Sequence, residues 1–479
     1  MRYMAAGASI LMVCGSLTFT PTAVADTTVS ADSTVMPYDY DGDGYSDMTV
    51  GVVGEDLKGT ADVGTVQVLY GSDGGVSSRD QLWHQGVKGV KGALERGDRF
   101  GRALASRDFD GDGYADLAVG IPDEDIRKKT NAGAVQVLYG GAKGLTARDQ
   151  IWHQGTAGVP GGNQIDDKFG FSLAAGDLNG DGYADLAIGL PYEDNGSVVL
   201  LFGASSGLTS ARSVRLRQGK NGMPSTPGGY ENFGRHLSMG DIDADGFDDL
   251  LIEVGSESDS TLTDYSVGSA VHVLRGSEAG VEPTGSQYIL PADLGLSEMW
   301  QVRQMALCDF NADARDDLVL SSNENVAVLH GSAEGLRPTP LPVSTTPGTD
   351  AVWSVSPWFD DDVGPDAACG DLTGDGNADL AVESVRAVKV IQGTAAGLEA
   401  TSTTWSDESW TWKDWTNLAV QPNSGGTHAW LVVNTINDVA VLRGTADGTA
   451  GPIETWSQNS PGVKGRKEAG DAFGLILGR

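Results

Sequence analysis

The nine residues Asp39–Asp47 read Asp-Tyr-Asp-Gly-Asp-Gly-Tyr-Ser-Asp, and the same frame recurs along the chain. Acidic or amide side chains stand at positions 1, 3, 5 and 9 of the frame, and Gly stands at position 6. Ala314 replaces this Gly in the fifth copy, and Thr373 replaces the acid at position 3 of the sixth. The further copies begin at Asp108, Asp177, Asp241, Asp309 and Asp371, about 60–70 residues apart. A frame kept at this spacing indicates a repeat protein.

Alternating oxygen-bearing side chains and one Gly that bends the backbone are how a short loop surrounds a hard cation. Calcium takes about six to eight oxygens, so the carbonyl of position 7 and water would complete the set. A plain acidic turn does not explain six copies in one register, and an EF-hand would close with Glu at position 12 between helices. The sequence therefore predicts up to six structural Ca²⁺ ions. The predicted ligands, with position 7 contributing its carbonyl, are Asp39, Asp41, Asp43, Tyr45, Asp47, Asp108, Asp110, Asp112, Tyr114, Asp116, Asp177, Asn179, Asp181, Tyr183, Asp185, Asp241, Asp243, Asp245, Phe247, Asp249, Asp309, Asn311, Asp313, Arg315, Asp317, Asp371, Thr373, Asp375, Asn377 and Asp379.

Each repeat surrounds its loop with short β-strand patterns. Phe-Gly precedes the loop, as at Phe100-Gly101, Phe169-Gly170 and Phe233-Gly234, and fades to Val363-Gly364. An apolar run follows the loop, then an alternating run such as Thr-Val-Gln-Val-Leu, then a run that ends in Trp in several repeats. Apolar or alternating runs between Gly-rich turns are typical of strands. Four short strands per repeat predict the blade of a β-propeller.

A seventh unit and the last residues complete the pattern. Residues 418–433 match a repeat in which Gln421, Gly425 and Ala429 replace three loop acids, so this unit is expected to bind no metal. The C-terminal Val463–Leu477 resembles Val90–Leu104 around Phe100, and the first repeat has no Phe-Gly of its own. We expect the tail to lie beside Val35–Tyr38 and to supply the missing strand. Closure of the ring would remove two exposed sheet edges. The predicted fold is all-β, a seven-bladed β-propeller closed by its two terminal segments.

These motifs resemble the FG-GAP repeats of the integrin alpha-chain propeller. The resemblance rests on Phe-Gly, the Asp loop, and Gly120-Ile121-Pro122 or Gly189-Leu190-Pro191 in the Gly-Ala-Pro position. It is strong in repeats two and three and weaker from the fifth onward. It implies a seven-bladed propeller with calcium in hairpins on one face and a partner on the other face.

Composition and charge narrow the class of protein. Of the 479 residues, 40% are hydrophobic, which is enough for a packed core, and the formal net charge of −34 disfavours nucleic acid and anionic lipid as partners. Residues 1–25 read as a signal peptide cleaved near Ala25, residues 26–34 as a linker and residues 35–479 as the propeller. We expect a secreted monomer without a membrane span, and disfavour lipid attachment at Cys14. Cys308 and Cys369 are interpreted as small buried residues, and a disulfide between them is left open.

The function predicted from these features is that of an extracellular binding or adhesion module for a protein or glycan. Trp405, Trp410, Trp412 and Trp415 form a dense segment that offers either a ligand surface or blade core. Arg96-Gly97-Asp98 spells an adhesion tripeptide, but Asp98 precedes Phe-Gly as Asp167 does and is better explained as part of the repeat. A propeller enzyme, such as a polysaccharide lyase or phospholipid hydrolase, and a structural surface component are the alternatives. No catalytic residue is predicted.

Overall fold

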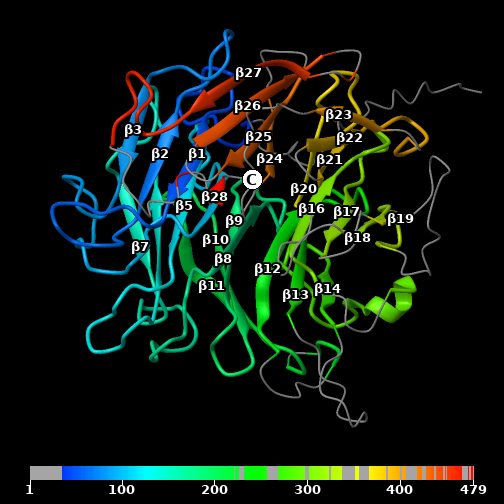
Figure 1. The fold of residues 1–479 in the computed structure, drawn as a ribbon. Helices are drawn as coiled ribbons and strands as arrows, with labels where there is room; N and C mark the ends of the chain where they lie inside the picture. Colours follow the sequence, from blue (N-terminus) through cyan, green and yellow to red (C-terminus); the bar gives the residue numbers. More distant parts are fainter. Residues whose placement is uncertain are drawn as a thin grey trace, which may run out of the picture.

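The chain folds into seven four-stranded antiparallel sheets arranged as the blades of a propeller, as seen in a computed structural model (Figure 1). It describes residues 35–479 apart from 221, 226–230, 256–267, 297–300, 323–324, 337–350, 355–365, 385–386, 400–401, 406–417, 423–427, 436–437, 446–447, 449, 466–472, 474–475 and 478–479. Within the described residues no helix is both long and apolar enough to cross a bilayer. One short 3-10 turn, η1 (Pro291–Leu294), is present beside the strands.

In blades 2 to 7 the chain begins with the innermost strand and ends with the outermost. Blades 2 to 4 contain β4 (Ala103–Arg107), β5 (Asp116–Ile121), β6 (Ala134–Leu138) and β7 (Asp149–Trp152); β8 (Ser172–Gly176), β9 (Asp185–Leu190), β10 (Ser197–Phe202) and β11 (Thr209–Leu216); and β12 (Phe233–Gly240), β13 (Asp249–Val254), β14 (Ala270–Leu274) and β15 (Gln287–Ile289). Blades 5 to 7 contain β16 (Gln304–Cys308), β17 (Asp317–Ser321), β18 (Asn325–Leu329) and β19 (Ala351–Ser354); β20 (Ala367–Gly370), β21 (Asp379–Ser384), β22 (Ala387–Ile391) and β23 (Ser402–Trp405); and β24 (Leu418–Gln421), β25 (Trp430–Thr435), β26 (Asp438–Gly444) and β27 (Ala450–Trp456).

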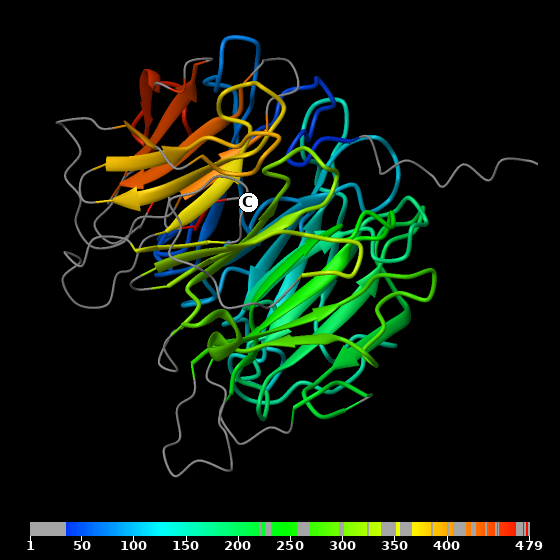
Figure 2. The ribbon, with the colours of Figure 1, turned by 90° about the vertical axis from the view of Figure 1, so that its right-hand side faces the viewer.

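The first blade is built from both ends of the chain. Its strands are β1 (Met48–Val52), β2 (Thr65–Leu69) and β3 (Asp80–Trp83), and β28 (Ile476–Leu477) adds the innermost strand. β28 runs antiparallel to β1, with Leu477 opposite Val50 and Ile476 opposite Gly51. The predicted closure of the ring by the terminal segments is therefore confirmed, although the strand paired with the tail is β1 and not Val35–Tyr38. In Figures 1 and 2 the last blade, orange to red, lies beside the first, in blue.

The core consists of clusters between blades. The described residues form seven buried apolar clusters, one at each junction, including the junction between blades 7 and 1. The Phe of Phe-Gly enters these clusters: Phe100, Phe169, Phe233 and Phe473 are all at most 1% exposed. Burial of one such side chain contributes roughly 1.5–3 kcal/mol. Val363-Gly364, the faded copy, lies outside the described residues.

A close backbone approach explains the glycines that accompany these Phe residues. A Cβ on Gly120, in β5, would lie 2.2 Å from the carbonyl oxygen of Gly170, and a Cβ on Gly189 would lie 2.2 Å from that of Gly234. Any side chain here would push two blades apart. The Phe-Gly of one blade thus packs directly onto the Gly-x-Pro of the preceding blade.

Candidate metal centres

The six Asp loops precede the second strand of blades 1 to 6 and lie at one end of those blades, because each follows an innermost strand or its place. Their backbone bends twice. Position 6 has a positive φ, for example +88° at Gly44, and Ala314 in the fifth loop adopts the same region at +63°. Position 4 also has a positive φ in every loop, including Ala244 and Ala312. The second bend was not anticipated from the sequence.

The carboxylate at position 1 stabilises this bent backbone. In each loop it accepts the N–H of position 6, as from Gly44 to Asp39 Oδ2 at 2.9 Å and from Ala314 to Asp309 Oδ2 at 2.8 Å. The side chain at position 5 accepts the N–H of position 7, as from Tyr45 to Asp43 at 3.0 Å. Both carboxylates keep further lone pairs for a cation, since each oxygen can accept more than one bond.

The acid at position 9 fixes the loop to its blade. Asp116 is fully buried, and it accepts the N–H of Phe109 at 2.9 Å and of Gly140, beyond β6, at 2.9 Å. The same pair of backbone donors serves position 9 in loops 1 to 5, and Thr373 and Gly393 serve Asp379 in the sixth. Position 9 therefore has a structural role with or without a metal ion.

In three loops the acids converge closely enough to share one cation. The groups are Asp39, Asp41 and Asp43; Asp108, Asp110 and Asp116; and Asp241, Asp243 and Asp249. In each group one ligand oxygen per residue lies within 4.8 Å of the others. Such a cluster repels itself unless a cation or protons neutralise it.

An arginine holds one oxygen of position 3 in these same loops. Arg79 pairs with Asp41, Arg148 with Asp110, and Arg275 with Asp243 at 2.9 Å. The guanidinium groups of Arg79 and Arg148 also lie over Tyr70 and Tyr139, at 3.9 and 4.0 Å from the ring centroids. The other oxygen of Asp243, Oδ1, is buried and accepts no hydrogen bond. An oriented carboxylate with one free buried oxygen fits a metal ligand, so the residues present fit Ca²⁺.

The proton affinity of the buried acids supports this fit. Burial, together with the neighbouring loop acids, raises the pKa of Asp47 and Asp116 to about 9 and that of Asp185 to about 8. Backbone N–H donors act in the opposite direction. A divalent cation among these carboxylates would favour their charged forms and remove the need for a proton.

Loops 3, 5 and 6 differ from this arrangement. In loop 3 the amide of Asn179 donates to Asp185 Oδ2 at 3.1 Å. In loop 5 Nδ1 of His330 lies 2.9 Å from Oδ2 of Asp317, the acid at position 9, and would compete with a cation for that oxygen. In loop 6 Thr373 offers a hydroxyl in place of a carboxylate. These loops supply fewer negative charges to a cation than loops 1, 2 and 4.

Comparisons with known proteins agree with the repeat pattern. The FG-GAP repeat family matches residues 100–138 and 169–201. The chain carries FG-GAP repeats. Over 185 residues it is 33% identical to phosphatidylinositol-glycan-specific phospholipase D of Bos taurus, which covers 37% of this chain and 21% of that protein. Over 216 residues it is 32% identical to integrin alpha-PS5 of Drosophila melanogaster, which covers 44% and 20%. The matched regions amount to about a fifth of the length of these relatives, which include both an enzyme and an integrin.

A solved structure shares the architecture. An Agrocybe aegerita lectin described as recognising non-reducing terminal N-acetylglucosamine superimposes with a TM-score of 0.52 at 14% identity. The match covers 86% of this chain and 90% of the lectin. At this identity the likeness shows the fold alone.

The structure also accounts for two motifs that suggest a function in the sequence. Asp98 of the Arg-Gly-Asp tripeptide is 2% exposed and accepts the N–H of Glu95 at 2.9 Å, as Asp167 accepts that of Gln164. Trp405 is 1% exposed, and its indole donates to the Gly448 carbonyl at 2.9 Å. The core alternative is therefore correct for Trp405, whereas Trp410, Trp412 and Trp415 lie outside the described residues.

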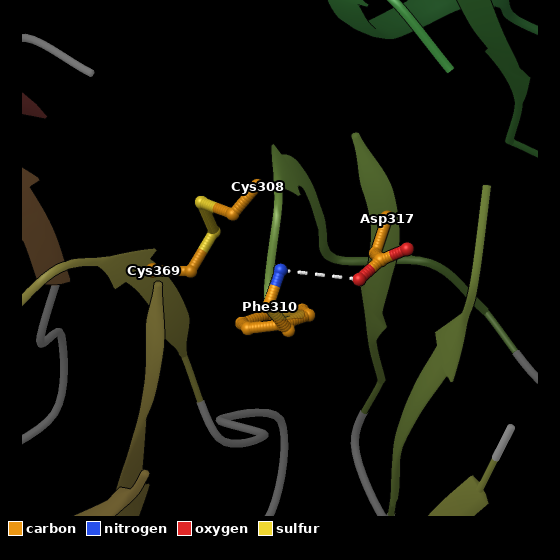
Figure 3. Close-up of a disulfide and its surroundings, with 4 residues drawn as sticks. All are labelled: Cys308, Phe310, Asp317 and Cys369. Atoms are coloured by element: carbon orange, nitrogen blue, oxygen red, sulfur yellow. Dashed lines mark hydrogen bonds between the residues drawn. A yellow bond between two sulfur atoms is a disulfide. The ribbon is translucent and has the colours of Figure 1, made fainter. Parts of the chain in front are cut away.

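The two cysteines of the propeller form a disulfide between blades 5 and 6 (Figure 3). Cys308 ends β16, directly before the fifth loop, and Cys369 lies in β20, with 6.2 Å between their Cα atoms. Both side chains are half-buried. The interpretation of these residues as small buried side chains was wrong, because their strands are neighbours around the ring and bring the two thiols together.

Proposed function

We propose that this protein is a secreted, calcium-stabilised propeller that serves as an extracellular binding module. The observation that carries the metal part is the convergence of acids in loops 1, 2 and 4, with an arginine on one oxygen of position 3. Bound Ca²⁺ would be held by positions 1, 3, 5 and 9 and would neutralise the clustered charge. Its role would be structural, since each loop connects the strands of one blade.

The binding part of the proposal rests on the difference between the two ends of the blades. The Asp loops occupy one end, so the opposite end is free to meet a partner. The two exposed large hydrophobic side chains of the described residues, Ile165 at 59% and Tyr192 at 53%, both lie at that opposite end, in the loops that precede β8 and β10. The FG-GAP relatives named integrins are consistent with such a role.

Thermal unfolding with and without calcium tests the metal part. Extracellular calcium sites commonly have a Kd of about 10⁻⁴–10⁻³ M. At 10 mM Ca²⁺ each site would then stabilise the fold by roughly 1.4–2.7 kcal/mol relative to chelator. The melting temperature should rise with Ca²⁺ and reach a plateau. Mg²⁺, which prefers a smaller octahedral set, should have a weaker effect.

A matched pair of variants makes this test specific. Asp110→Asn removes a predicted ligand of loop 2. Calorimetric titration should then count about one calcium site fewer, and the calcium-dependent rise in melting temperature should be smaller. Asp149→Asn changes a buried acid of the same blade that contacts Lys91 and not the loop. It should leave the calcium-dependent shift unchanged. A melting temperature that is identical in chelator and in 10 mM Ca²⁺ would overturn the metal part of the proposal.

A further inference from the structure

A cationic and aromatic cluster lies at the mouth of the ring opposite the Asp loops. Arg102, Phe171 and Arg235 stand directly after the Gly of Phe-Gly in blades 2, 3 and 4, at or just before the start of the innermost strand. Tyr192 joins them from the loop between β9 and β10. Because β8 contacts both β4 and β12 around the centre, these four residues are brought to one rim. We call them the mouth cluster.

Three side chains of the mouth cluster, those of Arg102, Phe171 and Tyr192, contact each other in a row. The Arg102 guanidinium carbon lies 5.0 Å from the centroid of the Phe171 ring. The Phe171 and Tyr192 rings meet edge to face with 5.4 Å between centroids. Tyr192 is 53% exposed, so one aromatic surface of the row is open to a ligand.

The positive charges of the mouth cluster lack acidic partners. In the part of the chain that the structure describes, neither the Arg102 nor the Arg235 guanidinium forms an ion pair or hydrogen bond with protein. The nearby acid, Asp123, is already paired with Arg99 at 3.3 Å and with Lys168. Burial lowers the pKa of Arg102. The charges of Arg99 and Arg235 lower it too, whereas Asp123 and Tyr192 act in the opposite direction. Free guanidinium groups are unexpected in a chain whose formal net charge is −34.

We propose that the mouth cluster binds one carboxylate carried on a sugar ring, as in a terminal uronic acid of an extracellular glycan. Arg102 and Arg235 would bind the carboxylate, since guanidinium and carboxylate match as paired hydrogen-bonding groups. The apolar C–H face of the sugar would lie on Tyr192, whose ring is exposed beside them. This inference rests on the proposed binding function and names its ligand.

The geometry favours a uronic acid over an acidic peptide or a polyanion. A uronic acid joins its carboxylate rigidly to an apolar ring face, which matches a guanidinium row that continues into an exposed aromatic ring. An Asp or Glu side chain brings its carboxylate on a flexible stem, whose ordering costs free energy. A long polyanion would be repelled by a chain whose formal net charge is −34.

Calorimetric titration with trigalacturonate at 5 mM Ca²⁺ tests the inference, with neutral trigalactose and an acetylated Asp-Asp-Asp peptide as comparison probes. Arg102→Gln should weaken trigalacturonate binding roughly tenfold or more, because a charge-assisted hydrogen bond is lost. Arg235→Gln, at an exposed position that the fold does not need, should also weaken it. Arg212→Gln is the matched control. Arg212 also lies 5.0 Å from an aromatic ring, that of Phe202, but at the Asp-loop end, and its substitution should have no effect.

Several outcomes would overturn the inference: no heat of binding at 10 mM trigalacturonate, equal binding of trigalactose, equal loss in Arg212→Gln, or tighter binding of the peptide. The melting temperature with and without Ca²⁺, measured on the same samples, reads the proposed function separately. Calcium could stabilise every variant while the wild type and Arg102→Gln capture extracellular glycan or protein equally well. In that case the mouth cluster is not the binding site, and the proposed function stands.

Discussion

Removal of the disulfide between blades 5 and 6 should destabilise the whole ring. Cys308 and Cys369 are 61 residues apart in sequence, so their bond closes a loop that is long in the unfolded chain. The chain-entropy relation assigns about 4 kcal/mol to a loop of this length. Divided by the unfolding entropy expected for a propeller of this size, that free energy corresponds to a fall in melting temperature of about 5 °C.

The prediction is tested on the double variant Cys308→Ala/Cys369→Ala by calorimetry and urea unfolding, each with and without reductant. The wild type should lose about 5 °C on reduction. The variant should melt near the reduced wild type and should not respond to reductant. Because Ala fits where a half-buried Cys stood, packing losses at these sites are small.

The result that would refute the reasoning is a variant that melts with the oxidised wild type. It would show that the innermost strands β16 and β20 are held by packing alone. A variant that still responds to reductant would show that the reductant acts elsewhere, and the wild-type shift could not then be assigned to Cys308–Cys369.

Further substitutions, each with a matched comparison, probe the buried packing of the blades. Burial lowers the pKa of His272 to about 3, below its unfolded value of about 6.5, so protonation favours unfolding. Between pH 6.5 and about 3 the wild type should therefore lose about 1.4 kcal/mol of unfolding free energy per pH unit relative to His272→Gln, as measured by urea unfolding. Gly120→Ala places a Cβ against the Gly170 carbonyl and should cost roughly 1–3 kcal/mol or more, whereas Gly162→Ala, with open space around it, should be nearly neutral. Phe473→Ala should cost about 3–5 kcal/mol, as Phe100→Ala should, because both rings fill equivalent junctions. A much smaller loss for Phe473→Ala would mean that the terminal junction is not a regular one.

The features that repeat along the chain were predictable from the sequence. Seven units, four strands each and closure by the tail follow from the recurrence of Phe-Gly, the Asp loop and the alternating runs. The Phe side chains are core and the Gly residues allow close approach, as their chemistry requires. The loops appear in the predicted register, with position 9 buried beneath each one.

The contacts that depend on which side chains meet across space were not predictable in the same way. Arg79 reaches Asp41 from 38 residues away, and only the recurrence of Arg-Asp before β3 and β7 hinted at such a role. Gly at position 4 of four loops was an unused signal of the second bend, and only Ala244 and Ala312 give no sign of their positive φ. The partner of Cys308 depended on the order of blades around the ring, which places β20 beside β16.

The junction between the last and first blades is built from the same contacts as an internal junction. The backbone and side-chain nitrogens of Lys464 donate to Asp80 as those of Lys91 donate to Asp149. Gln458 reaches Glu55 at 2.5 Å as Gln85 reaches Glu124 at 2.8 Å.

Because the junctions are equivalent, the stability of the closed ring depends on every one of them. In the closed ring every blade packs its apolar faces against two neighbours, whereas opening the ring at any one junction exposes two such faces to water. The fifth and sixth loops each carry one ligand acid fewer than loops 1, 2 and 4, the seventh unit has lost its loop acids, and the disulfide lies between blades 5 and 6. The covalent bond therefore strengthens the ring where consecutive units lack a full set of predicted metal ligands.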